Sequence, residues 1–213
     1  MQEQNKPLTK KNLARREKIK AIALQLFLQK GYDETSLSEI IKQANGSFSN
    51  IYDFFTNKEG LFFEILSDLC KEHAELISFK MGDIYSNELE DVLRSFGMVF
   101  VEIFNQTQVI SIGKIIFSRV YDSKQRLAKW LDDDDKMFAR NVLNDYFSKS
   151  TNNFIANNAK KLSEIFCTML IQPFHNLHIL TDLAPMNKAE QEEHVDFVVR
   201  LFLNGIPTGN FEK

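Results

Sequence analysis

The 213-residue chain contains few glycines, prolines and cysteines, and each scarcity excludes a class of structure. Eight Gly and four Pro leave little material for the many turns of an all-β fold. Cys70 and Cys167 are too few for a disulfide framework, so we expect reduced, packed thiols. No apolar run approaches the roughly 20 residues of a membrane-spanning helix, and the polar N-terminus has no signal-peptide core. We therefore expect a cytoplasmic protein with no membrane partner.

Charge is unevenly distributed along the chain. Residues 1–60 hold ten Lys or Arg against seven Asp or Glu, a net charge of +3. Residues 61–213 hold 16 Lys or Arg against 22 Asp or Glu, a net charge of −6. A basic cluster over residues 10–20 precedes the segment that begins at residue 35 and could face phosphates. A solvated helix face is the commoner reason for such a pattern. The cluster consists of Lys10, Lys11, Arg15, Arg16, Lys18 and Lys20.

Apolar residues recur at helical spacing over most of the chain and predict an all-α fold with no strand. Residues 1–10 read as a flexible, mildly basic arm. A kink is expected at Pro173, within one long apolar helix. The predicted helical segments are 11–30, 35–44, 48–55, 58–80, 89–104, 110–121, 124–131, 138–149, 154–180 and 188–204.

The segment from Thr35 to Lys58 predicts two short helices joined by a tight turn. Asn45-Gly46 is the residue pair most willing to adopt positive φ, and Ser47 is a good N-cap for the second helix. This pattern is a helix-turn-helix, which presents the N-terminal end of its second helix to base edges in the DNA major groove. The second helix directs Ile51, Phe54 and Phe55 to a core and leaves Phe48, Ser49, Asn50 and Tyr52 for other contacts.

One stretch combines small, polar, aromatic and basic residues at a specific spacing, namely Gly31, Tyr32, Asp33, Glu34, Thr35, Ser36, Ile40, Ala44, Ser47, Tyr52, Phe55, Lys58, Glu59 and Leu61. On the strength of these residues, the segment 12–62 resembles the DNA-binding domain of the TetR/AcrR family of transcriptional regulators. Asn45, Gly46 and Ser49 depart from the usual family pattern, which has Gly and then an apolar residue in the turn and Gly in place of Ser49. Residues 189–205 resemble the last dimerisation helix of many members.

This resemblance implies a DNA-binding helix-turn-helix domain over residues 1–57 and a larger helical effector-binding and dimerisation domain over 58–213. We accordingly expect a homodimeric repressor that a small apolar or aromatic effector releases from a double-stranded, pseudo-palindromic DNA operator. Phe48 is expected either to contact a thymine methyl group or to pack locally. By resemblance, the residues that approach DNA are Thr35, Ser47, Ser49, Asn50, Tyr52 and Lys58.

The larger domain is rich in aromatic residues, which suit a cavity for an apolar effector, although any one of them can equally pack against the others. Arg119, Asn141 and His178 are the polar candidates to orient the effector. Binding is expected to move the long helix 58–80. The apolar candidates are Phe96, Phe100, Phe104, Ile116, Trp130, Phe138, Phe166, Met169 and Phe174.

Catalytic and metal sites find little support in the sequence. His175 and His178 lie three residues apart, but no cysteine or carboxylate beside them completes a metal motif, so we expect polar pocket lining and no cofactor. The sequence contains no match to the motifs of phosphate-binding loops or nucleophile elbows, so we expect no catalytic residue. A helical enzyme or a protein-binding adaptor remains the alternative, and salt-dependent binding of duplex DNA would separate the regulator from both.

Overall fold

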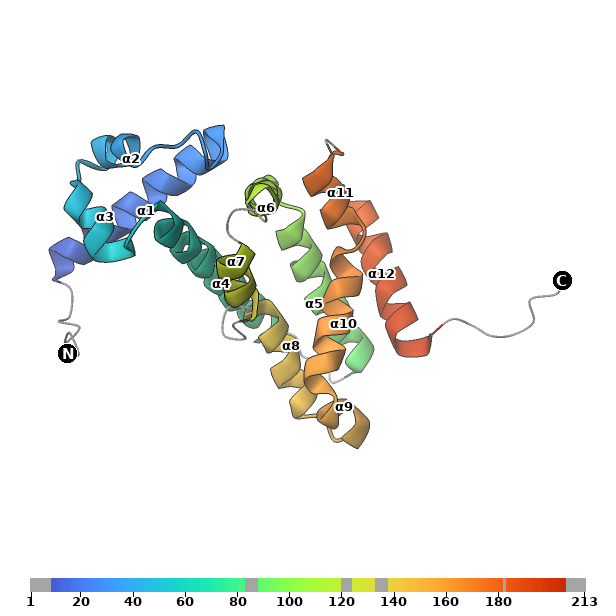
Figure 1. Cartoon of the computed structure of the whole chain (residues 1–213). Helices are drawn as coiled ribbons and strands as arrows, with labels where there is room; N and C mark the ends of the chain where they lie inside the picture. The colour runs from blue at the N-terminus through green and yellow to red at the C-terminus, as the bar shows by residue number, and fades with distance from the viewer. Residues whose placement is uncertain (1–8, 83–87, 120–123, 133–137, 182, 206–213) are drawn as a thin grey trace. The chain divides into compact units, whose positions relative to one another are not determined.

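The computed structural model describes residues 9–82, 88–119, 124–132, 138–181 and 183–205 and confirms the all-α class (Figure 1). These described residues form twelve helices and no strand. None of these helices is long and apolar enough to cross a membrane. The chain divides into two compact units, residues 1–69 and 70–213. The division falls within a long helix that begins at Lys58, where the sequence predicts the start of the second domain.

The first unit contains α1 (Lys10–Lys30), α2 (Leu37–Ala44), α3 (Phe48–Phe55) and the first half of α4 (Lys58–Gly82). Gly31 ends α1, as predicted, with φ of 84° and its N–H bonded to the carbonyl of Phe27. Glycine adopts this positive φ without steric cost.

The core of the first unit draws apolar residues from all four of its helices. Phe27, Tyr32 and Phe62 form an aromatic cluster whose ring centroids lie 5.3–5.6 Å apart. Such pairs add to the stabilisation from burial alone. The other buried apolar residues include Ile19, Ala23, Leu26, Ile40, Ile41, Ala44, Ile51, Phe55, Leu61 and Ile65.

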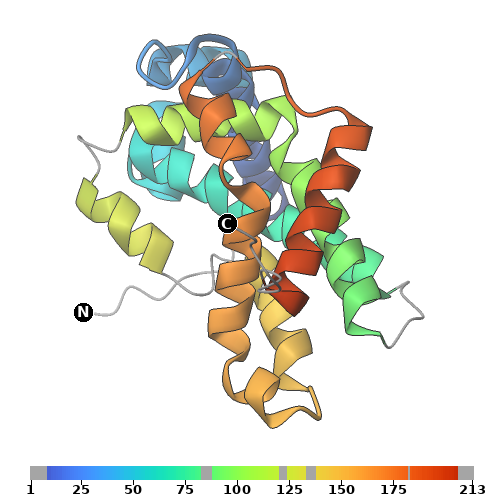
Figure 2. The same ribbon diagram turned by 90° about the vertical axis from the view of Figure 1, so that its right-hand side faces the viewer.

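The described residues of the second unit continue from α4 with eight further helices. Helix α10 packs on α8 and α5, and α12 packs on α5 and α10, as Figure 2 also shows. Leu93, Phe96, Phe147, Phe166 and Val195 are among the residues buried between them. The helices are α5 (Leu89–Phe104), α6 (Thr107–Ser118), α7 (Lys124–Asp132), α8 (Phe138–Ser148), α9 (Asn153–Asn157), α10 (Ala159–Ile171), α11 (Phe174–Leu180) and α12 (Lys188–Asn204).

The prediction of one kinked helix over residues 154–180 is wrong, because the segment forms three helices. Asn158 leaves helical geometry with φ of −115°, and its side-chain amide donates to the carbonyl of Phe154. Such local bonds compete with the helix. Gln172 is extended, with ψ of 142°. The residue before a proline avoids the helical region, so Pro173 separates α10 from α11.

Close packing of α5 against α12 gives a first testable prediction. A Cβ added at Gly97 would lie 2.8 Å from Cγ1 of the fully buried Val195. We expect Gly97→Ala to lower the free energy of unfolding by about 1–2 kcal/mol, because overpacking outweighs the better helix propensity of Ala. Urea unfolding followed by circular dichroism measures this change.

Two matched variants separate overpacking from other effects. Gly82→Ala, where the added Cβ meets nothing within 4 Å, should change stability by less than about 0.5 kcal/mol. In a Val195→Ala background, Gly97→Ala should cost little, since the opposing methyl group is gone. If Gly97→Ala lowers the free energy of unfolding equally in the wild-type and Val195→Ala backgrounds, overpacking against Val195 is not the cause.

Candidate nucleic-acid interface

The turn between α2 and α3 is fixed by local bonds. Asn45 ends α2 in the left-handed conformation, with φ of 52°, which Asn tolerates better than most residues. Ser47 precedes α3, and its backbone N–H donates to Oδ1 of Asn50 at 3.0 Å. The predicted turn and the predicted start of the second helix are therefore confirmed.

Helix α3 has one buried side and one exposed side. Ile51 and Phe55 lie in the core, whereas Phe48 is 49% and Tyr52 61% exposed. Ser49 is also exposed, and its hydroxyl lies 2.8 Å from that of Ser47. The exposed side thus offers a hydroxyl pair, a phenol and an apolar ring, which suit polar base edges, phosphates and a thymine methyl group respectively.

Asn50 has a different role from the one predicted. Its Oδ1 accepts the Ser47 N–H, so the amide is already engaged at the start of α3. The bidentate contact by which Asn reads adenine needs both the oxygen and the nitrogen of the amide. The geometry makes Asn50 a residue that positions α3, not one free to read a base in this way.

The structure does not support a DNA contact for the side chain of Thr35. This side chain is fully buried, and its hydroxyl donates to the carbonyl of Gly31 at 2.8 Å. The backbone N–H of Thr35 bonds to the carbonyl of Tyr32 at 3.2 Å. Thr35 therefore closes the α1–α2 turn from within.

Lys58 stands at the first position of α4 and is held against the α1–α2 turn. Its Nζ lies 4.2 Å from the centre of the Tyr32 ring and 3.5 Å from the carbonyl oxygen of Asp33. Cation–π attraction and this carbonyl fix the ammonium group without neutralising its charge. A phosphate contact by Lys58 remains a prediction that this geometry permits.

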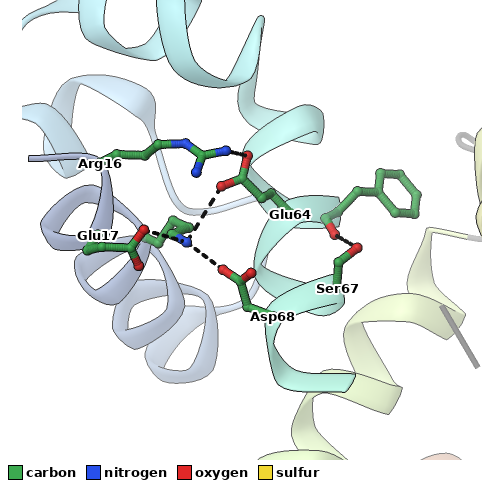
Figure 3. A network of polar contacts seen from close by, with 7 residues as sticks. Arg16, Glu17, Glu64, Ser67 and Asp68 are labelled. Carbon is green, nitrogen blue, oxygen red and sulfur yellow. Dashed lines mark hydrogen bonds and ion pairs between the residues drawn. The ribbon is translucent and has the colours of Figure 1, made fainter. Parts of the chain in front are cut away.

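An ion-pair network, which we name the α1–α4 network, consists of Arg16, Glu17, Lys20, Glu64 and Asp68 (Figure 3). Lys20 Nζ lies 2.5 Å from Asp68, 2.9 Å from Glu17 and 3.6 Å from Glu64. Arg16 bonds Glu64 at 2.7 Å, and its guanidinium carbon lies 5.7 Å from the centre of the Phe55 ring in α3. Two of the six basic residues predicted to face phosphates are therefore used inside the unit.

Burial and pairing shift two pKa values in this network in ways that affect stability. Burial lowers the pKa of Lys20, but hydrogen bonds to Asp68 and Glu17 outweigh it and raise the pKa above 10.5. Lys20 thus stabilises the folded state up to that pH, and this contribution is lost above its folded pKa. Burial raises the pKa of Glu64 against the opposing charges of Arg16 and Lys20. Its ionisation therefore disfavours folding as the pH rises from 4.5 through the raised value.

Among the described residues, the predicted effector residues of the second unit lie in different surroundings. Phe96 stacks on Phe100 at 5.4 Å and lies 6.2 Å from Phe166, so these three rings pack against each other. Phe104, Phe174 and His178 line a small internal space, and Asn141 lines a separate polar groove between α8 and α10. Ile116, Arg119, Trp130 and Met169 are half-buried and line neither space, and the side chain of Phe138 lies outside the described residues.

His175 and His178 both contact backbone carbonyls through Nδ1. His175 lies 3.2 Å from the oxygen of Phe104, and His178 lies 3.1 Å from that of Leu183. Burial lowers the pKa of His175, which favours the neutral ring. Within the described residues, no three His, Cys, Asp or Glu side chains group as a metal site.

Sequence and structure comparisons agree on one family. The family model described as bacterial regulatory proteins, tetR family, matches residues 19–65. The uncharacterized HTH-type transcriptional regulator YvkB of Bacillus subtilis (strain 168) is 25% identical over 193 residues, which cover 86% of this chain and 93% of YvkB. The HTH-type negative transcriptional regulator IcaR of Staphylococcus aureus (strain Newman) is 24% identical over 54% of this chain and 66% of IcaR.

A solved structure of a protein from Mesorhizobium loti MAFF303099, assigned to the TetR family, superposes with a TM-score of 0.77. The superposition covers 92% of this chain and 98% of that one. At 22% sequence identity, this likeness extends the shared fold to both units and says nothing of the ligand.

The buried position of Lys20 gives a second prediction. Lys20→Met leaves Glu17, Glu64 and Asp68 without their shared ammonium group, so we expect the free energy of unfolding to fall by about 1–3 kcal/mol at neutral pH. The loss should be smaller at about pH 5 than at about pH 8, because protonation of Glu64 relieves the repulsion.

Lys71→Met is the matched control. Lys71 pairs with Glu75 at 3.9 Å on the exposed surface of α4, where such a pair contributes little. Urea unfolding at both pH values compares the two variants. Equal losses for the two substitutions would contradict a structural role for the α1–α4 network.

Proposed function

We propose that this chain, which belongs to the tetR family of bacterial regulatory proteins, represses transcription as a homodimer bound to a pseudo-palindromic duplex operator. It is a DNA-binding transcriptional regulator. The observation that carries the proposal is the exposed N-terminal side of α3, held outward by a fixed turn and a buried face. Similarity to a negative regulator supports repression as its mode of action.

The proposed contacts divide into two groups. Ser47, Phe48 and Ser49 face base edges, where hydroxyl groups and a thymine methyl can be read. Tyr52 and Lys58 hold phosphates, which fixes the register of the protein on the duplex without reading sequence. This division gives the half-exposed ring of Phe48 a role.

The dimer face is proposed on α10 and α12, which pack side by side. Ile165 on α10 is 43% and Phe197 on α12 60% exposed, although both helices also carry buried apolar residues. Apolar side chains left outside the core of a helical unit mark interaction surfaces. Two copies of this face would form a four-helix interface with two-fold symmetry.

Effector control is proposed to act through α4, the one described helix that contributes residues to both units. A small molecule bound in the second unit changes operator affinity only if it favours one position of this helix over another. A helical enzyme or a protein adaptor would leave the exposed side of α3 without a role. Salt-dependent binding of duplex DNA separates these classes, because phosphate contacts release counterions.

Two substitutions at α3 and α4 test the proposed contacts with DNA. Ser49→Ala should weaken operator binding by about 1 kcal/mol and leave binding to random duplex unchanged, since it removes a base-edge contact. Lys58→Ala should weaken both and lower the slope of log K against log salt by about one unit, because a phosphate contact is lost. Fluorescence anisotropy at several salt concentrations measures both effects. If the two variants show the same loss of affinity and the same salt dependence, the division into base-reading and phosphate-binding residues is wrong.

The dimer face gives a further prediction. Phe197→Lys should convert the protein to a monomer at micromolar concentration, because it buries two symmetry-related charges in an apolar interface. Phe79→Lys is the control, since Phe79 is an equally exposed phenylalanine on α4. Light scattering measures the mass of each variant. A dimeric Phe197→Lys protein with undiminished operator affinity would refute the proposed face.

A further inference from the structure

His178 in α11 is buried with one ring nitrogen unpaired. Its side chain is 2% exposed, and Nδ1 lies 3.1 Å from the carbonyl oxygen of Leu183. A carbonyl oxygen only accepts, so Nδ1 carries the hydrogen. In the neutral ring Nε2 is then an acceptor, and no hydrogen-bond partner approaches it. Among the described residues of the second unit, no other buried side-chain nitrogen or oxygen is in this state.

Two adjoining spaces meet at His178. The inner one, of about 10 Å³, is lined mainly by apolar residues of α5, α10 and α11. The outer one is a groove of about 450 Å³ along α11 and α12, with Phe174, Leu183 and Phe197 among its lining residues. Phe174, His178 and Met186 line both spaces. The inner space is therefore the closed end of the groove.

The side-chain amide of Asn105 and Nδ1 of His175, which also lie at this end, already have partners. Asn105 donates to the carbonyl of Met186 at 2.6 Å and accepts its N–H at 2.8 Å. Nδ1 of His175 lies 3.2 Å from the carbonyl of Phe104. Among the described residues at this end, Nε2 of His178 is the buried acceptor without a partner, and the space that His178 lines has about the room that one water molecule or one hydroxyl group needs.

We propose that the groove between α11 and α12 binds a neutral aromatic molecule whose hydroxyl group donates a hydrogen bond to Nε2 of His178. The aromatic body of this ligand lies against Phe174 and Leu183, and its hydroxyl enters the closed end. In identifying this ligand as the effector, the proposal rests on the proposed function.

The chemistry of the lining selects this ligand class. A carboxylate cannot donate to Nε2, and Glu190 and Glu193 line the outer groove, where they repel anions. An ammonium group could donate, but no Asp or Glu lines the closed end, where an unpaired charge would be costly to bury. A hydroxyl group on an aromatic ring satisfies the acceptor without either penalty.

The test uses 2-naphthol and 2-methoxynaphthalene, which share a ring system but differ in the hydrogen-bond donor. Isothermal titration of the full chain should show that 2-naphthol binds about tenfold more tightly, since one buried hydrogen bond separates the two compounds. Equal affinities, or no binding of 2-naphthol, would overturn the proposal. This comparison uses the unaltered protein, so it holds even if a variant fails to fold.

Two histidine variants locate the effect. His178→Asn keeps a donor for the Leu183 carbonyl but removes the acceptor at Nε2, so the preference for 2-naphthol should disappear. His175→Asn makes the same change at the neighbouring ring, whose Nδ1 also contacts a carbonyl, and should keep the preference. Retention of the preference in His178→Asn, or its loss in His175→Asn alone, would overturn the assignment of the acceptor.

Operator binding in the presence of 2-naphthol distinguishes this inference from the proposed function. Release of the operator together with the tenfold preference supports both. If the preference is present but operator affinity does not change, the hydroxyl site stands and the effector role fails. If the operator binds but 2-naphthol does not, the hydroxyl site fails and DNA recognition stands.

Discussion

Burial of one side of α3 is the constraint on which the DNA-binding unit depends. An eight-residue helix is too short to be stable by itself in water, so α3 exists because Ile51 and Phe55 are packed beneath it. Packing these two residues inward turns Phe48, Ser49 and Tyr52 outward. The exposed side that we propose to read DNA is therefore a direct consequence of the core.

The α1–α4 network extends this constraint to the neighbouring helices. Arg16 reaches Glu64 in α4 and the Phe55 ring in α3, so one side chain ties three helices together. Lys20 stays charged because its carboxylate partners compensate for burial. Removing one member leaves the remaining charges unpaired, which is costly. The network therefore fixes the arrangement of the helices, and its net contribution to stability is small.

Local features of the fold could be predicted from the sequence, and long-range ones could not. Gly31, Asn45 and Ser47 act on their own backbone, so their turns and caps were predictable from residue type. Lys20 and Asp68 are 48 residues apart, and helical periodicity shows that Lys20 is charged without showing which partner it meets. The same limit applies to the predicted effector residues. Periodicity placed Phe96 and His178 on helices, but it could not show that the two side chains lie in separate surroundings.

Selection of duplexes from a random library by the full-length protein tests the central claim most directly, because it asks whether the outward side of α3 reads sequence. The account predicts enrichment of a two-fold symmetric site, with relaxed preference at the same position in both half-sites when Phe48 is replaced by Ala. Enrichment of no sequence, or an unchanged selected site in Phe48→Ala and Ser49→Ala alike, would contradict it.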